Sequence, residues 1–417
     1  MKRVWVDLTT SHQDVGRTAH GTLRVERGIV GALAERGDPR IGFVVFEQKL
    51  GRFQALSAHE AARIATTPAR PARDRELVPV WKRRIWGMET RLRRLLSPSP
   101  PMKCPGPGEE VPFRPGETML FIGEHNRHNF AHLAELKQTQ RLALVFLFYD
   151  LLRVLEDDDP RLRHGPPNSL PATDFMVREA TLFLSISRFS AEILQNHLVR
   201  RGAPPRPIVP IRLSGHPPVT SAHAEPVPDL RPGGFVLSVG DVVHRKNHRL
   251  LVRVWAALIA KGLSVPILVI VGRIDLEGNA LVRSVRLDPR LRSLVRFLPN
   301  VNDAALLWLY RSCCYTVFPS LLEGFGLPVA ESLSQGKACL ASSAAAIPEA
   351  GQGAATTLDP TDAAAWEAAV IRLNDDAALA EEEARVARLF HPVTWADAAE
   401  EIVSILTHHG HLNGEPA

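Results

Sequence analysis

The chain has little cysteine and no long hydrophobic segment. Its 417 residues include four cysteines, none of them spaced as a C-x-x-C pair, so a zinc knuckle is not expected. Low cysteine content also favours a reducing compartment over a disulfide framework. The N-terminal segment MKRVWVDLTTSHQD lacks the apolar core of a signal peptide, and no segment approaches the ~20 apolar residues that cross a bilayer. We therefore expect a cytoplasmic protein.

The sequence also lacks a strong excess of one charge. It has 50 lysines and arginines against 45 acidic residues, which gives a net charge of +5. An excess this small does not require a nucleic-acid partner, and it suits an anionic substrate or an anionic membrane surface equally well. The hydrophobic fraction of 45% is ordinary for a globular protein, and the length suggests two or three domains.

Strand and helix patterns alternate along both halves of the chain. Strands are expected at 3–8, 41–47, 117–123, 142–150, 181–187, within 203–215, and at 234–240, 265–272, 295–299, 314–320, 338–342 and 354–359. Helices are expected at 22–36, 79–96, 188–201, 247–261, 303–313, 328–335, 361–374, 376–389 and 394–408. Repeated strand–helix units predict parallel sheets, and the ligands of such sheets bind at the carboxyl ends of the strands.

We therefore expect an α/β fold with two Rossmann-like domains facing a central cleft. The N-terminal domain covers 1–215 and the C-terminal domain 216–393, with a proline-rich linker at the start of the second. The last segment, 394–417, is a helix and tail expected to pack back across the domains.

One proline- and arginine-rich segment, 66–116, interrupts the first half and is interpreted as an insertion. Within it, 81–96 has apolar residues at helical spacing and basic residues on the other faces. Such a helix can lie on an anionic membrane, bind an acidic polysaccharide, or pack on its own domain with a solvated basic face. The sequence leaves these three readings open.

The stretch FPSLLEGFGLPVAESLSQG at 318–336 places an acid on each side of a tight turn. Glu323 lies in the loop and Glu331 lies one turn inside the following helix, which Pro328 can start because proline suits the first helical position. The free amides at 325–327 suit an anion or sugar hydroxyls, and carboxylates accept hydrogen bonds from hydroxyls. The alternative is that Glu323 caps the helix and Glu331 is solvated.

A basic pair, Arg245 and Lys246, follows the strand at 234–240. Arginine offers a forked contact to phosphate and lysine a point charge, and Asn247 can cap the helix that follows. A basic pair in a surface loop usually has no function. Here its place after a strand favours a phosphate site. The basic pair and the turn with its two acids together indicate a nucleotide-sugar pocket.

The second half resembles the donor domain of the family 4 glycosyltransferases, which have the GT-B fold. The resemblance covers about 234–375 and rests on VLSVGDVVHRKNHRLL, VRFLPNVNDAALLWLYRSC, VFPSLLEGFGLPVAESLSQGKACLASSAAAIPEA and TLDPTDAAAW. The first half matches more loosely, through GTLRVERGI, a strand that ends in YD, and SISRFSAEIL.

The resemblance implies a retaining transfer of a sugar from a nucleotide diphosphate sugar, without a cofactor or a required metal. It implies that Arg245 and Lys246 hold the diphosphate and that Glu323 contacts the donor sugar, the three forming the catalytic set. Glu331 would then bind the ribose. The remaining donor contacts implied are the amides of Phe325, Gly326 and Leu327, the base contact of Leu298, and the approach of Gly21 to the β-phosphate.

The chain departs from many relatives at two places. It has Asp241 where they carry an arginine, and Tyr149 and Asp150 where they carry a His-Asp pair whose histidine faces the donor sugar. A tyrosine can still donate one hydrogen bond, so the choice of sugar stays open. His125, in the polar stretch EHNRHNFAH after a strand, is a candidate for the acceptor side of the cleft.

The sequence thus predicts a hexosyltransferase of surface polysaccharide synthesis that acts on a saccharide or lipid-linked acceptor, peripherally at the membrane if 81–96 binds it. By resemblance the favoured donor is GDP-mannose, with other hexoses and UDP donors open. One alternative is a catalytically silent nucleotide-sugar-binding scaffold subunit of a polysaccharide assembly complex. Another is an enzyme like glycogen synthase or phosphorylase, which would depend on an α-glucan or on free phosphate.

Overall fold

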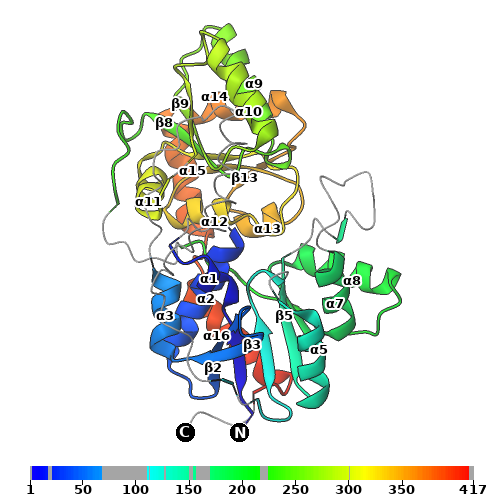
Figure 1. The fold of residues 1–417 in the computed structure, drawn as a ribbon. Helices are drawn as coiled ribbons and strands as arrows, with labels where there is room; N and C mark the ends of the chain where they lie inside the picture. Colours follow the sequence, from blue (N-terminus) through cyan, green and yellow to red (C-terminus); the bar gives the residue numbers. More distant parts are fainter. Residues whose placement is uncertain are drawn as a thin grey trace, which may run out of the picture.

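The computed structural model describes residues 2–16, 21–67, 110–111, 113–125, 128–149, 154–155, 170–216, 224–299 and 301–412. The predicted helix at 79–96 and Asp150 lie outside these ranges. Two sheets, each flanked by helices, form two α/β domains stacked end to end, with the N-terminal domain at the bottom of Figure 1. The predicted pair of Rossmann-like domains is confirmed.

The N-terminal sheet has the strand order β3-β2-β1-β4-β5-β6-β7. Its strands are β1 (Val4–Asp7), β2 (Ile41–Glu47), β3 (Arg52–Leu56), β4 (Thr118–Phe121), β5 (Ala143–Phe148), β6 (Leu182–Ser185) and β7 (Ile208–Pro210). Its helices are α1 (Thr9–Gln13), α2 (Gly21–Arg36), α3 (Ala58–Thr66), α5 (Phe130–Thr139), α7 (Leu170–Glu179) and α8 (Arg188–Arg200). Neighbouring strands run parallel except β3, which pairs antiparallel with β2. This edge strand was not predicted.

The C-terminal sheet is parallel throughout, in the order β10-β9-β8-β11-β12-β13. Its strands are β8 (Phe235–Val239), β9 (Ile267–Val271), β10 (Val295–Leu298), β11 (Thr316–Phe318), β12 (Cys339–Ser342) and β13 (Thr356–Leu358). Its helices are the 3-10 turn η3 (His244–Lys246), α9 (His248–Ala260), α10 (Leu276–Leu287), α11 (Asp303–Ser312), α12 (Leu327–Ser334), α13 (Ile347–Gly351), α14 (Ala363–Leu373) and α15 (Asp376–Leu389).

Both sheets reverse their winding direction once, between β1 and β4 in the first and between β8 and β11 in the second. The loops that leave the carboxyl ends of the strands part at such a point and leave a crevice, where ligands bind in open α/β sheets. The topology therefore singles out the loops after β8 and β11. These loops carry the basic pair and the first acid of the predicted site.

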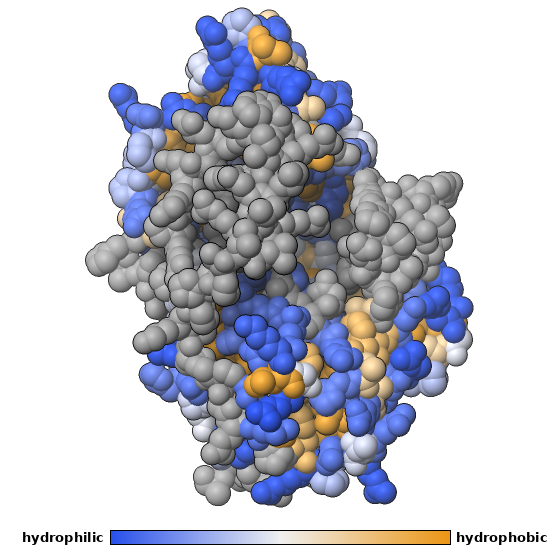
Figure 2. Space-filling view, in the orientation of Figure 1, coloured by the Kyte–Doolittle hydropathy of each residue, from blue (hydrophilic) through white to orange (hydrophobic). Residues whose placement is uncertain are grey.

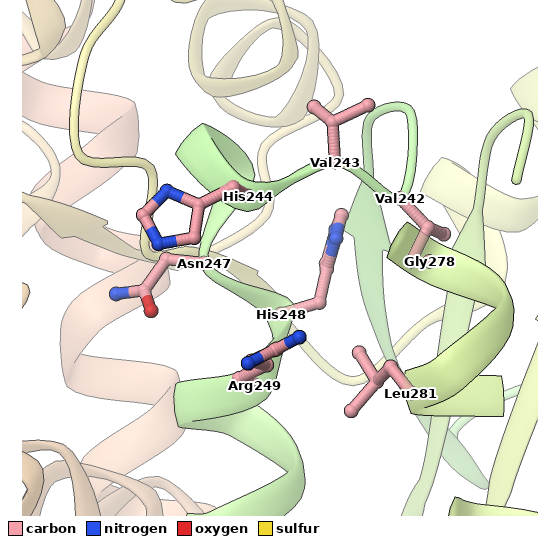
Figure 3. Close-up of a pocket in the computed structure, with 8 residues that line it drawn as sticks. All are labelled: Val242, Val243, His244, Asn247, His248, Arg249, Gly278 and Leu281. Carbon is pink, nitrogen blue, oxygen red and sulfur yellow. The ribbon is translucent and has the colours of Figure 1, made fainter. Parts of the chain in front are cut away.

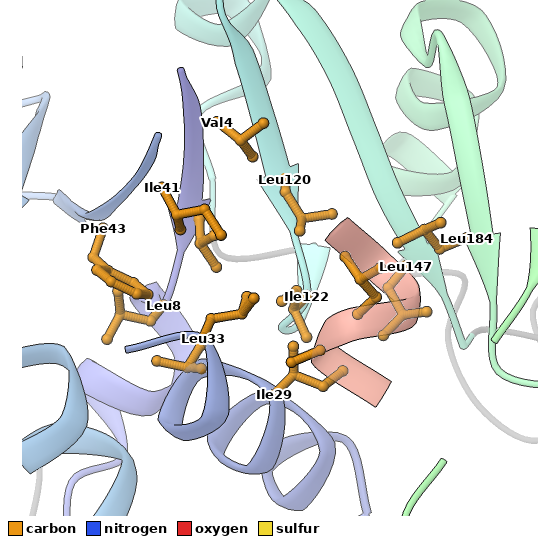
Figure 4. Close-up of a cluster of buried hydrophobic side chains, with 14 of the residues drawn as sticks. Val4, Leu8, Ile29, Leu33, Ile41, Phe43, Leu120, Ile122, Leu147 and Leu184 are labelled. Carbon is orange, nitrogen blue, oxygen red and sulfur yellow. The ribbon is translucent and has the colours of Figure 1, made fainter. Parts of the chain in front are cut away.

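The final helix, α16 (Trp395–His408), belongs to the core of the N-terminal domain. Its residues Ile402 and Leu406 are buried with Ile29 and Leu33 of α2 against one face of the sheet, and Figure 4 shows this cluster between the strands and two helices. The two helices meet closely, because a β-carbon added at Gly28 would overlap the indole ring of Trp395. The chain thus crosses from the second domain back to the first.

Hydrophilic side chains cover most of the described surface of the upper domain in the view of Figure 2, with small hydrophobic patches between them. Within the ranges that the structure describes, no helix is long and apolar enough to span a bilayer.

Candidate active site

A cavity of about 600 Å³ lies between the two domains. From the N-terminal domain it is lined by Gly21, Thr22, Arg24, Val25, Glu124, Tyr149, Ile186 and Leu213. From the C-terminal domain it is lined by Val239, Gly240, Asp241, Arg245, Lys246, Val271, Gly272, Arg273, Pro299, Val301, Leu306, Leu322, Glu323, Gly324, Phe325, Gly326, Leu327, Pro328 and Glu331. The structure therefore brings the predicted basic pair and both predicted acids to one cavity.

The basic pair and the first acid form one ionic cluster. Arg245 Nη1 lies 2.9 Å and Lys246 Nζ 2.7 Å from the same oxygen of Glu323, Oε1. The Ser320 hydroxyl donates to that oxygen as well, at 2.5 Å. Among the described residues, Oε2 of Glu323 has no hydrogen-bond donor. The Oε1 atom of Glu323 is thus occupied by the two cations and Ser320, and its Oε2 atom is available to a ligand.

The cluster shifts the proton affinities of its members. Burial lowers the pKa of Lys246, and the negative charge of Glu323 opposes this without cancelling it. Burial also acts to raise the pKa of Glu323, but the charges of Lys246 and Arg245 outweigh it and leave that pKa below its ordinary value. Glu323 is therefore ionised at neutral pH and accepts hydrogen bonds only.

Hydrogen bonds hold the loops after β8 and β11 together. The amide of Leu321 donates to the carbonyl of Arg245 at 2.7 Å, and the oxygen of Ser320, whose single proton goes to Glu323, lies 3.0 Å from that carbonyl. Asn247 occupies the N-cap position before α9, as predicted, but its side chain makes no cap hydrogen bond to that helix. It donates instead to the carbonyls of Pro319 and Pro360, at 3.2 and 2.9 Å. These contacts fix the basic pair beside the acid.

The turn before α12 lines the cavity with Phe325, Gly326 and Leu327. Gly326 has a φ of 112°, in the region that favours glycine, and it precedes the first helical residue, Leu327, without any side-chain cap. Within the described ranges, the amides of Phe325, Gly326 and Leu327 have no backbone acceptor. Because the start of a helix carries partial positive charge, this turn suits a phosphate or a sugar hydroxyl.

The second acid, Glu331, is held by two donors from different domains. Arg24 of α2 pairs with its Oε1, and the hydroxyl of Tyr310 donates to its Oε2 at 2.7 Å. Only 4% of the Glu331 side chain is exposed, so the reading of a solvated acid is wrong. The sequence reasoning missed both donors, and only the position of Arg24 three residues after Gly21 could have pointed to the first.

The other predicted residues divide into two groups. Gly21 and Tyr149 line the cavity, and the Tyr149 hydroxyl is buried without a partner among the described residues. Leu298 does not line the cavity, whereas Pro299 next to it does. His125 does not line it either. It is 8% exposed, its Nε2 lies 2.9 Å from the carbonyl of Leu147, and burial lowers its pKa to about 4.

Asp241 occupies the cavity rim as part of an ion pair that was not predicted. The Arg273 guanidinium meets its carboxylate with two nitrogens, the shorter contact being 2.6 Å. Burial acts to raise the pKa of Asp241, but the hydrogen bonds and charge of Arg273 outweigh it and lower that pKa. Arg273, in the loop that follows β9, thus lies beside the acid at this position.

A second pocket, of about 40 Å³, lies behind the basic loop and is too small for a sugar. Figure 3 shows His248 at its centre, between the loop of Val242 and Leu281 of α10. Burial and the nearby charge of Lys246 lower the pKa of His248 to about 3, so this ring is neutral. No three His, Cys, Asp or Glu side chains come together as metal ligands in the part of the chain that the structure describes.

Comparison with protein families gives one match, to a model described as "Glycosyl transferases group 1", over residues 234–376. The chain is 32% identical over 144 residues to O-antigen chain mannosyltransferase B of Escherichia coli, a region that covers 34% of this chain and 38% of that protein. It is 35% identical over 121 residues to the serotype-specific mannosyltransferase WbdA of E. coli, covering 28% of this chain and 15% of that protein. The chain thus spans well under half of both relatives.

Solved structures resemble the whole chain. Sucrose-phosphate synthase from Thermosynechococcus elongatus matches with a TM-score of 0.59 and 17% identity, over 98% of this chain and 99% of that one. Alr3699/HepE from Anabaena, in complex with UDP-glucose, matches with a TM-score of 0.58 and 13% identity, over 98% of this chain and 100% of that one. At identities this low, the similarity shows that the chain shares their fold and nothing further.

Proposed function

We propose that the protein transfers a hexosyl group from a nucleotide diphosphate sugar to a saccharide or lipid-linked saccharide. The match of residues 234–376 to the group 1 glycosyltransferases and the GT-B fold of the chain support this proposal. We further propose that the transfer retains the anomeric configuration and needs no metal. The observation that carries the proposal is the convergence of Arg245, Lys246, Glu323 and Glu331 on one cavity between the domains.

The basic pair serves the leaving group. As the bond to the anomeric carbon breaks, negative charge builds on the departing diphosphate, and preorganised donors aimed at that charge are each worth about 3–4 kcal/mol. Glu323 neutralises one of the two cations, so Arg245 and Lys246 together offer the diphosphate one net positive charge. The amides at the start of α12 add further donors, and this combination does the work for which other enzymes use a metal.

Glu323 and the turn before α12 serve the sugar. Glu323 lines the cavity, and its Oε2 atom, which has no donor among the described residues, can accept a hydrogen bond from a sugar hydroxyl. Its other oxygen is fixed by three donors, so the carboxylate does not have to be oriented when the sugar arrives. Tyr149 reaches the same cavity from the N-terminal domain and has a hydroxyl to offer.

We propose that the transferred sugar is mannose and that the product is a surface polysaccharide. Two relatives that match the C-terminal domain are named as mannosyltransferases, one of them of the O-antigen chain. GDP-mannose is therefore the first donor to test. The alternative is a silent scaffold that binds the nucleotide sugar without turnover.

The test is a donor panel of GDP-mannose, UDP-glucose and UDP-galactose, with and without mannosyl acceptors. We expect release of the nucleoside diphosphate from one donor, faster with an acceptor, in the presence of EDTA. The anomeric configuration of the product, read by NMR, decides between retention and inversion. Tight binding of a donor without any release, over the whole acceptor set, would support the scaffold, and loss of turnover in EDTA would overturn metal independence.

A further inference from the structure

We propose that Arg24 is a positioning residue that orients Glu331 from the opposite domain, and so makes recognition of the nucleotide's ribose depend on contact between the two domains. The inference rests on the proposed function, because it takes Glu331 as the acceptor of the ribose hydroxyls.

The contact is an ion pair across the cleft. Arg24 lies in the first turn of α2 in the N-terminal domain. One of its terminal nitrogens pairs with Oε1 of Glu331 in α12, and the other lies 3.4 Å from Oδ1 of Asp303, at the start of α11. The side chains of all three residues are 12% exposed or less. One guanidinium from the first domain therefore holds two acids of the second.

The arrangement still leaves Glu331 able to bind a ligand. A carboxylate has about four lone pairs. Arg24 takes one on Oε1 and the Tyr310 hydroxyl takes one on Oε2. About two lone pairs then remain, one on each oxygen, which is what the two neighbouring hydroxyls of a ribose require. Both Arg24 and Glu331 line the cavity, and we therefore place the ribose against this carboxylate.

Removing Arg24 would change the orientation of the Glu331 carboxylate and little else in the donor pocket. Tyr310 alone holds one oxygen, and a carboxylate held at one point can rotate away from the ribose. The diphosphate site lies elsewhere, on Arg245 and Lys246, which Arg24 does not contact. The loss of Arg24 should therefore weaken the binding that depends on the ribose hydroxyls and leave the affinity for the diphosphate unchanged.

The same geometry couples ribose binding to domain contact. The N-terminal domain also touches the loop before α12, since the hydroxyls of Ser187 and Ser190 donate to the carbonyl of Gly324 at 2.6 and 2.9 Å. A domain that moves away takes Arg24 from Glu331. By reciprocity, a nucleotide that binds the oriented carboxylate favours the state in which the domains touch.

The experiment compares the binding of GDP and UDP with that of their 2′,3′-dideoxy forms and of inorganic pyrophosphate, by titration calorimetry. In the wild-type protein we expect the dideoxy form of the preferred nucleotide to bind at least tenfold more weakly. In Arg24→Met the ratio should fall below threefold, with pyrophosphate binding unchanged within twofold. Arg36→Met, an exposed position at the other end of α2, should keep the wild-type ratio.

Two further variants keep the test open if Arg24→Met does not fold. Arg24→Lys retains the charge without the fork and should give an intermediate ratio. Asp303→Asn removes the second anchor of Arg24 without touching Glu331, and should also lower the ratio. A wild-type ratio in these variants, or an equal loss of affinity for nucleotide and pyrophosphate, would overturn the inference alone. Failure of the wild-type protein to bind GDP or UDP would overturn the proposed function, and the inference with it.

Discussion

Lys246 and Glu323 form an ion pair with 2.7 Å between Nζ and Oε1, and their side chains are only 10% and 11% exposed. Removal of one partner from such a pair leaves the other charge buried and less compensated, which is costly. The pair therefore supports the structure of the loops after β8 and β11 as well as the charge of the cavity. Substitution of either residue is therefore expected to change both the stability of these loops and the activity.

Replacement of Lys246 by alanine should lower kcat/KM about 100-fold or more, because one well-aimed donor to the leaving group is worth roughly 3–4 kcal/mol. Steady-state release of the nucleoside diphosphate measures it. Arg253→Ala serves as the control, since Arg253 is exposed on α9 and does not line the cavity. Near-normal turnover in Lys246→Ala would remove this residue from the mechanism.

Turnover should fall on the alkaline side at a pH below 10.5, the ordinary pKa of a lysine. Burial lowers the pKa of Lys246 from that value, and its charge is lost as the pH rises through the lowered pKa. A pH profile of kcat/KM checks this, because kcat/KM reports the pKa values of the protein without bound donor. In Lys246→Arg the alkaline fall should move to higher pH or vanish, because a guanidinium keeps its proton. An unchanged profile in that variant would assign the fall to another group.

Glu26 should make the protein less stable as the pH rises. It is fully buried, accepts a 2.5 Å hydrogen bond from the Ser11 hydroxyl at Oε2, and has no partner for Oε1 among the described residues. Burial, helped by the charge of Asp7 and opposed by that of Arg27, raises its pKa from 4.5 to about 8. The folded state then binds more protons than the unfolded state between these values, so stability falls across this window.

The variant Glu26→Gln cannot ionise and should escape that loss. Its melting temperature relative to the wild-type protein should be higher at pH 8.5 than at pH 5. Glu35→Gln, at an exposed position of the same helix, should show no such difference. A constant offset between Glu26→Gln and the wild-type protein at both pH values would contradict the predicted titration.

Gly28→Ala should lower the free energy of unfolding by about 1–3 kcal/mol, the usual cost of overpacking. The added methyl group would overlap the Trp395 ring, and that ring is also tied by a 2.7 Å hydrogen bond from its Nε1 to the carbonyl of His216. Thermal or denaturant unfolding measures the change. Gly31→Ala is the matched control on α2, because its β-carbon would lie 3.7 Å from that of Ala65, and it should be neutral or slightly stabilising.

The sequence predicts much of the fold because the parallel strands are buried and read as apolar runs. It does not predict β3, an edge strand whose residues Arg52 and Gln54 break the apolar pattern. In the site, the turn chemistry of Gly326 and the place of Arg245 after a strand are local signals. The pairing of Arg24 with Glu331 joins residues 307 positions apart, and nothing local reveals such a contact. His125 was expected at the acceptor side of the cleft because its neighbours in the sequence are polar, but its ring is buried.

Arg245 and Lys246 are expected to bind the pyrophosphate while Glu331 binds the ribose of the same nucleotide. A crystal structure with the bound nucleoside diphosphate decides whether they do. We predict phosphate oxygens within hydrogen-bond distance of Lys246 Nζ and ribose hydroxyls on the Glu331 carboxylate, with Arg24 still in place. A nucleotide bound outside this cavity, or with its ribose at Lys246 and its phosphates at Glu331, would show that these residues do not have the proposed roles.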